Sequence, residues 1–148
     1  RRADAIMVSV VFYEKPGCAN NARQKALLAA AGHSVWAKNL LAEDWTPERL
    51  RPFFGALPVA QWFNPSAPRI KSGEVEPDTL SEAEALRAMT EDPLLIRRPL
   101  MEAEGQRRVG FDLIEVDAWL GLQSLLPQQD VETCTRARPG TACRVPQP

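Results

Sequence analysis

The chain has 148 residues, enough for one domain with a buried core. Its 45% hydrophobic and 25% charged residues are ordinary for a globular protein, and a net charge of −1 gives no basis for direct binding to nucleic acids or to anionic membranes. No apolar run approaches the roughly 20 residues that a membrane-spanning helix needs, so we expect no membrane span.

The N-terminal end and the cysteines predict the compartment. Met7 is the expected native start, with residues 1–6 as an upstream or added segment. This end lacks the apolar core of about 7–15 residues that a secretory signal contains. The three cysteines make no disulfide framework for a chain of this size, so we expect a reducing cytoplasm.

The first 40 residues predict a β-α-β unit. Residues 7–13 are β-branched and aromatic throughout, which is typical of a central strand. The pattern from Cys18 to about Ala31 is helical, and Gly32 is the expected end of the helix. A second short strand follows at 33–41. A unit of this length implies a parallel pair of strands with a right-handed crossover.

Residues 44–92 predict a helical subdomain inserted into this α/β core. Thr46 is the expected N-cap of the first helix, with proline at the first helical position. Further short helices are expected at 58–63 and 79–90, the latter opening at Thr79 or Ser81.

The α/β pattern resumes after the insertion. Strands are expected at 93–102 and 107–111, with a hairpin turn at 104–106. Asp112 is the expected cap of a helix at 113–120, whose Ile114, Val116 and Trp119 should face the core. Residues 7–121 would thus form the domain, and the Pro- and Gln-rich residues 122–148 a mobile tail.

Cys18 is the main candidate for chemistry. It follows a Pro-Gly turn and opens the first helix, where unpaired backbone N–H groups and the positive end of the helix dipole favour a thiolate. Lys15 could add to that field. The alternative is a small apolar residue that fills the junction between strand and helix, and spacing does not decide between the two.

The order of elements resembles the thioredoxin-like fold, and two motifs resemble the arsenate reductase (ArsC)/Spx family. The motifs are Tyr13-Glu-Lys-Pro-Gly-Cys-Ala-Asn-Asn-Ala-Arg at the front and Asp92-Pro-Leu-Leu-Ile-Arg-Arg-Pro-Leu-Met with Val109-Gly-Phe at the back. The run that begins at Glu14 looks most like the branch called nitrogenase-associated proteins. The resemblance spans about residues 7–121.

The resemblance implies roles for specific residues. Cys18 would be the nucleophile, and Arg98 the arginine that precedes a cis proline, Pro99, placed against the thiol. Asn20 and Asn21 would donate N–H groups to the thiolate or the substrate, or else be polar residues of an exposed first helical turn. The resemblance further implies no bound cofactor, and glutathione or glutaredoxin as the thiol partner.

The chain also departs from the family pattern. Asn21 stands where Spx-type members have a second cysteine, and the two further arginines of arsenate reductases fall near Trp62-Phe63 and near Gly110. An aromatic wall there would favour a peptide or a thiol over arsenate. Four arginines nearby in the sequence could take the place of the two missing ones: Arg69, Arg97, Arg107 and Arg108. We expect Arg97 on the opposite, solvated face of its strand and the last two on the hairpin surface.

Other reactive residues are assigned mostly structural roles. His33, the only histidine, lies at the far end of the first helix and is expected to be structural, so no metal site is predicted. The four tryptophans are expected to pack in the core or the insertion. Cys134 and Cys143 could pair across a Pro-Gly turn, resolve an adduct on Cys18, or stay unpaired.

Two classes of function follow. In one, the protein is a thiol oxidoreductase whose Cys18 attacks an electrophile held by Arg98. In the other, it is a regulatory binding module like Spx-type proteins. The resemblance to nitrogenase-associated proteins favours an ArsC-like accessory protein of nitrogen fixation, with a protein of the nitrogenase system as a partner. The position of Cys18 and the two missing arginines imply a reactive cysteine with inefficient arsenate turnover. A glutathione- or glutaredoxin-dependent arsenate reductase is the alternative.

Overall fold

A computed structural model describes residues 7–122, which contain a four-stranded sheet of order β2-β1-β3-β4. Strand β1 (Ser9–Glu14) pairs in parallel with β2 (Ser34–Asn39) and antiparallel with β3 (Leu100–Ala103). Strand β4 (Gln106–Val109) pairs antiparallel with β3 at the far edge. The predicted parallel unit and the central position of the first strand are confirmed.

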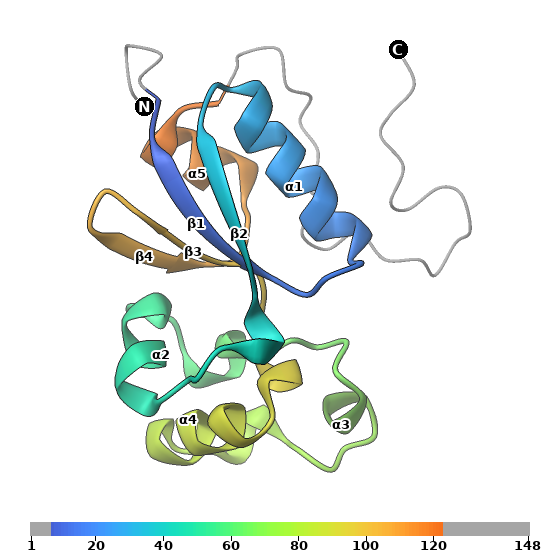
Figure 1. Ribbon diagram of the computed structural model, residues 1–148. Helices are drawn as coiled ribbons and strands as arrows, with labels where there is room; N and C mark the ends of the chain where they lie inside the picture. The colour runs from blue at the N-terminus through green and yellow to red at the C-terminus, as the bar shows by residue number, and fades with distance from the viewer. Residues whose placement is uncertain (1–6, 123–148) are drawn as a thin grey trace.

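Two helices cover one face of the sheet (Figure 1): α1 (Ala19–Ala30) and α5 (Leu113–Leu120). Alternate side chains of β1 point to this face, where Val10 and Phe12 are fully buried against Leu28 of α1. This arrangement is the predicted thioredoxin-like α/β fold.

The chain between β2 and β3 is helical and lies beyond one end of the sheet (Figure 1). Its α-helices are α2 (Pro47–Phe54), α3 (Pro68–Lys71) and α4 (Glu82–Glu91). Short 3₁₀ turns connect them: η1 (Leu40–Ala42), η2 (Val59–Trp62), η3 (Pro77–Thr79) and η4 (Pro93–Leu95).

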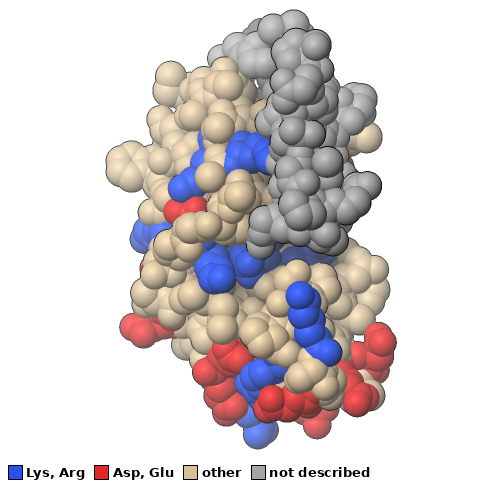
Figure 2. All heavy atoms as spheres, turned by 90° about the vertical axis from the view of Figure 1, so that its right-hand side faces the viewer, with Lys and Arg blue, Asp and Glu red and all other residues tan. Residues whose placement is uncertain are grey.

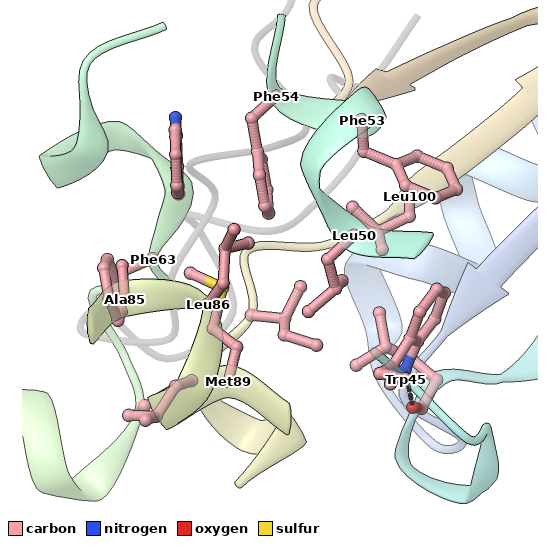
Figure 3. Packing of buried hydrophobic residues seen from close by; sticks show 14 of the residues in the cluster. Trp45, Leu50, Phe53, Phe54, Phe63, Ala85, Leu86, Met89 and Leu100 are labelled. Atoms are coloured by element: carbon pink, nitrogen blue, oxygen red, sulfur yellow. Dashed lines mark hydrogen bonds between the residues drawn. The ribbon is translucent and has the colours of Figure 1, made fainter. Parts of the chain in front are cut away.

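The helical part has its own aromatic core, in which side chains of α2 and α4 meet (Figure 3). Phe54 stacks on Trp62 with ring centroids 4.7 Å apart, and Trp45 packs edge-on against Phe53. Tyr13 of β1 joins this core, so one cluster connects the sheet to the helices. Burial raises the pKa of the Tyr13 phenol, and the neighbouring Glu102 carboxylate raises it further.

Side-chain caps begin the helices as predicted. Thr46 accepts a hydrogen bond from the backbone of Arg49 (3.1 Å), and Asp112 accepts one from Glu115 (3.0 Å). Of the two candidates for α4, Ser81 is the cap, and it forms a capping box with Glu84. Hydrogen bonds from the backbone and the side chain of Ser81 lower the pKa of Glu84.

Several predicted boundaries were wrong. The segment 93–102 is not one strand, because the Asp92 side chain caps the 3₁₀ turn η4 and β3 begins only at Leu100. The hairpin turn is confined to Glu104 and Gly105, both with positive φ, so Gln106 already pairs in the sheet.

Two apolar side chains predicted to be packed are exposed. Ile114 is 71% exposed, because in a helix it lies about 200° around the axis from Val116, which is buried. Trp36 is 60% exposed, because β2 is an edge strand and Trp36 points to the face opposite α1. The other three tryptophans are buried as expected.

His33 is structural, as predicted. It is buried, its Nδ1 accepts the backbone N–H of Val8 (3.2 Å), and its Nε2 lies 2.7 Å from the carbonyl oxygen of Gly121. This pairing assigns the proton of the neutral ring to Nε2. The imidazole therefore joins the start of β1 to the end of α5.

Candidate functional site

Cys18 is the N-cap of α1, and the turn before it fixes its position. Gly17 has φ 84°, a conformation that favours glycine, and the Cys18 N–H donates to the carbonyl of Lys15 (3.1 Å). The cysteine is half-buried and free. Since the N–H groups of the first helical turn lack intrahelical partners, a thiolate here lies in a favourable field.

Asn21 holds this turn from inside the protein. Its side chain is 1% exposed; its Oδ1 accepts the backbone N–H of Lys15 (3.1 Å), and its Nδ2 donates to Oε1 of Gln24 (2.9 Å). The expectation of an exposed polar residue was therefore wrong for Asn21. The position that carries a second cysteine in Spx-type proteins carries a brace for the Cys18 turn instead.

The two arginines before Pro99 reach the same site through an extended segment. Residues 95–97 pair with residues 62–64: Asn64 donates to the carbonyl of Leu95 (2.9 Å) and Arg97 to that of Trp62 (3.0 Å). The Arg98-Pro99 bond is cis, as the family resemblance implied. Because Arg97 precedes β3, strand alternation does not apply to it, and the prediction that it faces away was wrong.

Cys18, Arg97 and Arg98 line one cavity of about 530 Å³ between the start of α1 and the loops around η2 and α3. Its other lining residues are Asn20, Asn21, Gln24, Ala60, Gln61, Phe63, Asn64, Pro65, Ser66, Ile70 and Pro77. The lining thus combines a thiol, two guanidinium groups and five carboxamides, and it contains no carboxylate. Such a lining suits an anionic ligand with hydrogen-bonding groups.

Figure 2 shows basic side chains across the middle of the molecular surface, whereas acidic side chains gather at its lower end. Within the cavity, Arg97 Nη1 donates to the carbonyl of Gln61 (3.2 Å), which fixes its guanidinium. Arg98 differs, because its Nε is buried and has no hydrogen-bond partner in the part of the chain that the structure describes. A buried donor of this kind needs an acceptor, which a bound anion would supply.

The remaining predicted residues lie elsewhere. Lys15 contributes its backbone to the Cys18 turn and does not line the cavity, and neither does Pro99, whose carbonyl accepts the N–H of Gly110 (2.8 Å). Of the aromatic pair, only Phe63 lines the cavity, since Trp62 packs in the core. Cys134 and Cys143 fall outside the described residues.

Three of the four substitute arginines make other contacts. Arg69 binds Glu74 and Asp92, and these two carboxylates raise its pKa. Arg107 pairs with Glu102, while Arg108 lies over the ring of Trp119. The predicted surface position of Arg107 and Arg108 is confirmed.

Of the five cavity carboxamides, the sequence singled out Asn20 and Asn21 but not Gln24, Gln61 or Asn64. A signal existed in α1, where Asn21 and Gln24 share a helical face with the core residue Leu28. Polar residues on an apolar helical face indicate buried hydrogen bonds or a site. Gln61 and Asn64 lie in irregular segments, where no periodicity could have indicated them.

Within residues 7–122, no group of three or more His, Cys, Asp or Glu side chains could hold a metal ion. In the same range, no helix has both the length and the apolar character needed to cross a membrane.

Comparison with known proteins assigns the family. The ArsC family model matches residues 13–119. A Rhodospirillum rubrum protein named "uncharacterized 15.7 kDa protein in draG 3′ region" is 56% identical over 128 residues, which are 86% of this chain and 89% of the relative. The arsenate reductase ArsI2 of Synechocystis is 28% identical over 95 residues, covering 62% of this chain and 67% of that enzyme.

Solved structures agree with this assignment. An arsenate reductase from Vibrio cholerae superposes with a TM-score of 0.60 at 29% identity, over 71% of this chain and 92% of the other. An ArsC family related protein from Bacteroides fragilis superposes with a TM-score of 0.66 at 24% identity, over 74% of this chain and 97% of the other. It shares the fold. With the family model covering most of the described domain, the chain belongs to the ArsC family.

Proposed function

We propose that this protein is a thiol-dependent oxidoreductase of arsenate reductase type, in which Cys18 is the nucleophile and Arg98 binds the anionic substrate. The observation that carries the proposal is that Cys18 and Arg98 line the same cavity, and that the Nε of Arg98 is buried without a hydrogen-bond partner among residues 7–122. Arg97, which the sequence had placed on the opposite face, adds a second positive charge to that cavity. It thereby supplies part of the charge that the family pattern places near Trp62-Phe63 and Gly110.

The proposed chemistry conserves atoms and electrons. The Cys18 thiolate attacks arsenic(V), and one arsenate oxygen leaves as water. An external thiol then attacks the Cys18 sulfur, so that two electrons pass to arsenic, arsenite leaves and a mixed disulfide remains on Cys18. A second external thiol reduces that disulfide. Glutathione and glutaredoxin are the proposed donors, because Asn21 has no thiol and cannot resolve the adduct on Cys18. The Asn21 side chain is instead held by its hydrogen bonds to Lys15 and Gln24.

Arsenite formation in the presence of arsenate, glutathione and glutaredoxin tests this proposal. Cys18→Ser should abolish turnover. Arg98→Met should lower kcat/KM by about 10–100-fold, since a hydrogen bond to a charged group contributes about 1.5–3 kcal/mol. Arg69→Met is the matched control, because Arg69 is bound to carboxylates away from the cavity and should leave turnover unchanged.

Intact-mass analysis of the same samples provides a second readout. In a Cys134→Ser/Cys143→Ser background the chain should gain one glutathione adduct, and the same chain with Cys18→Ser should gain none. Turnover that survives in Cys18→Ser, or an Arg98→Met variant as active as Arg69→Met, would contradict the proposal.

A role in nitrogen fixation is a second candidate, which the Rhodospirillum rubrum relative favours. That relative is 56% identical and is named for its place beside draG, in keeping with the resemblance to nitrogenase-associated proteins. Deletion of the gene in the source organism would separate the candidates. Impaired growth on dinitrogen with normal arsenate tolerance would support an accessory function with a protein partner. Normal growth on dinitrogen with reduced arsenate tolerance would support arsenate reduction.

A further inference from the structure

The outer edge of β2 has free hydrogen-bonding groups. The Ser34 N–H donates to the carbonyl of Val8 (2.9 Å), and alternate residues of a parallel strand bond to the same neighbour. Val35 and Ala37 therefore direct their N–H and C=O groups away from β1. Within residues 7–122, no backbone hydrogen bond joins either residue to another element.

The side chains of this edge do little to prevent association. Trp36 is 60% exposed at the middle of the strand, on the face opposite α1. Lys38, on that same face, is exposed and has no ion pair among the described residues. The opposite edge of the sheet is different, since β4 has only four residues and carries Arg107 and Arg108. Proteins commonly protect free strand edges with such charges and short lengths.

We propose that β2 pairs antiparallel with β2 of a second copy of this chain, with a two-fold axis at Ala37. In this register Ala37 faces the partner's Ala37 and Val35 faces the partner's Asn39, so the outward groups on both strands exchange hydrogen bonds. In the same register Trp36 lies opposite the partner's Lys38. The lysine ammonium and the indole ring can then form a favourable cation–π interaction.

A second copy suits this edge because the edge is self-complementary. Two identical strands in this register offer donors and acceptors in matching order, and no two like charges stand directly opposite each other. Moreover, the one cation of each strand meets the one exposed aromatic ring of the other. The dimer would contain a continuous eight-stranded sheet, twice the four strands of the single chain.

Sedimentation equilibrium of the full chain from about 1 μM to about 1 mM tests the proposal, with dimer expected to form within that range. Ala37→Pro is the informative variant. It removes an outward N–H while the bonds of β2 to β1 remain, and proline is tolerated on edge strands. Two hydrogen bonds are lost per dimer, so the dissociation constant should rise about tenfold or more.

Trp36→Ser should weaken the dimer as well. Ile114→Ser is the matched control, since Ile114 is an apolar residue on α5 that is also exposed, and its loss should leave the dimer unchanged. Circular dichroism of each variant checks that it is folded. A chain that stays monomeric over the whole range, or a dimer that Ala37→Pro does not weaken, would overturn the proposal.

Discussion

Replacing Asn21 by alanine should destabilise the protein through the turn that positions Cys18. The Asn21 side chain satisfies the N–H of Lys15 and the Oε1 of Gln24, and it is 1% exposed. Alanine would remove both hydrogen bonds, and a buried group left unsatisfied costs about 1–3 kcal/mol. Because the Lys15 N–H is only partly buried, we expect a total loss of about 2–3 kcal/mol.

Urea unfolding followed by tryptophan fluorescence measures this loss, and thermal unfolding should show a midpoint lower by about 10 °C. Asn39→Ala is the matched control. Asn39 is exposed and its Oδ1 accepts the N–H of Leu41 (2.9 Å), so its loss should cost only about 0.5–1 kcal/mol. Equal destabilisation by the two variants would refute the assignment of Asn21 as an internal brace.

A charged variant separates the brace from the chemistry. Asn21→Asp keeps the oxygen that accepts the Lys15 N–H but brings a negative charge into the cavity beside Cys18. A nearby like charge disfavours a thiolate, so iodoacetamide should alkylate Cys18 several-fold more slowly at pH 7 than in the wild type. The comparison uses a Cys134→Ser/Cys143→Ser background. Unchanged alkylation would mean that Asn21 does not share the electrostatic environment of the thiol.

Three further predictions concern stability. His33→Ala should cost about 2–4 kcal/mol in urea unfolding, because it removes the partners of one buried and one partly buried backbone group and creates a cavity; a loss below 1 kcal/mol would contradict the structural role. Ser81→Ala should cost about 1 kcal/mol at pH 7, because Ser81 Oγ caps the N–H of Glu84. The difference from wild type should shrink only in part as the pH falls below about 4.5, because the variant keeps the residue 81 backbone N–H, which is the main cause of the lowered pKa of Glu84. The raised pKa of Tyr13 stabilises the fold below pH 10 and this contribution is lost as the pH rises further, so Tyr13→Phe should show a shallower alkaline decline in unfolding free energy between pH 10 and 12.

Local chemistry in the sequence determined the helix starts and the place of the nucleophile. Thr46, Ser81 and Asp112 cap their helices through side-chain oxygens that reach backbone N–H groups three residues ahead. Cys18 could likewise be placed at a helix start from the Pro-Gly turn before it. These contacts span a few residues, which is why a single sequence predicts them.

The β-α-β unit and the family pattern were also predictable. The length of the apolar strand, the helix and the following strand allows only a parallel pair. The motif around Cys18 and the Arg-Pro motif beyond residue 92 together gave the family, which the ArsC family model confirms.

Tertiary structure alone decided which other residues join Cys18 and Arg98 in the site. Arg97 enters the cavity because its segment pairs with residues 62–64, a contact between segments more than 30 residues apart. Gln61 and Asn64, in or next to the paired segment, line the same cavity as Cys18. The exposure of Trp36 depends on which strand lies at the edge of the sheet, since identical residues in a central strand would be buried. Side-chain environments of this kind depend on which distant segments become neighbours, and no local pattern contains that information.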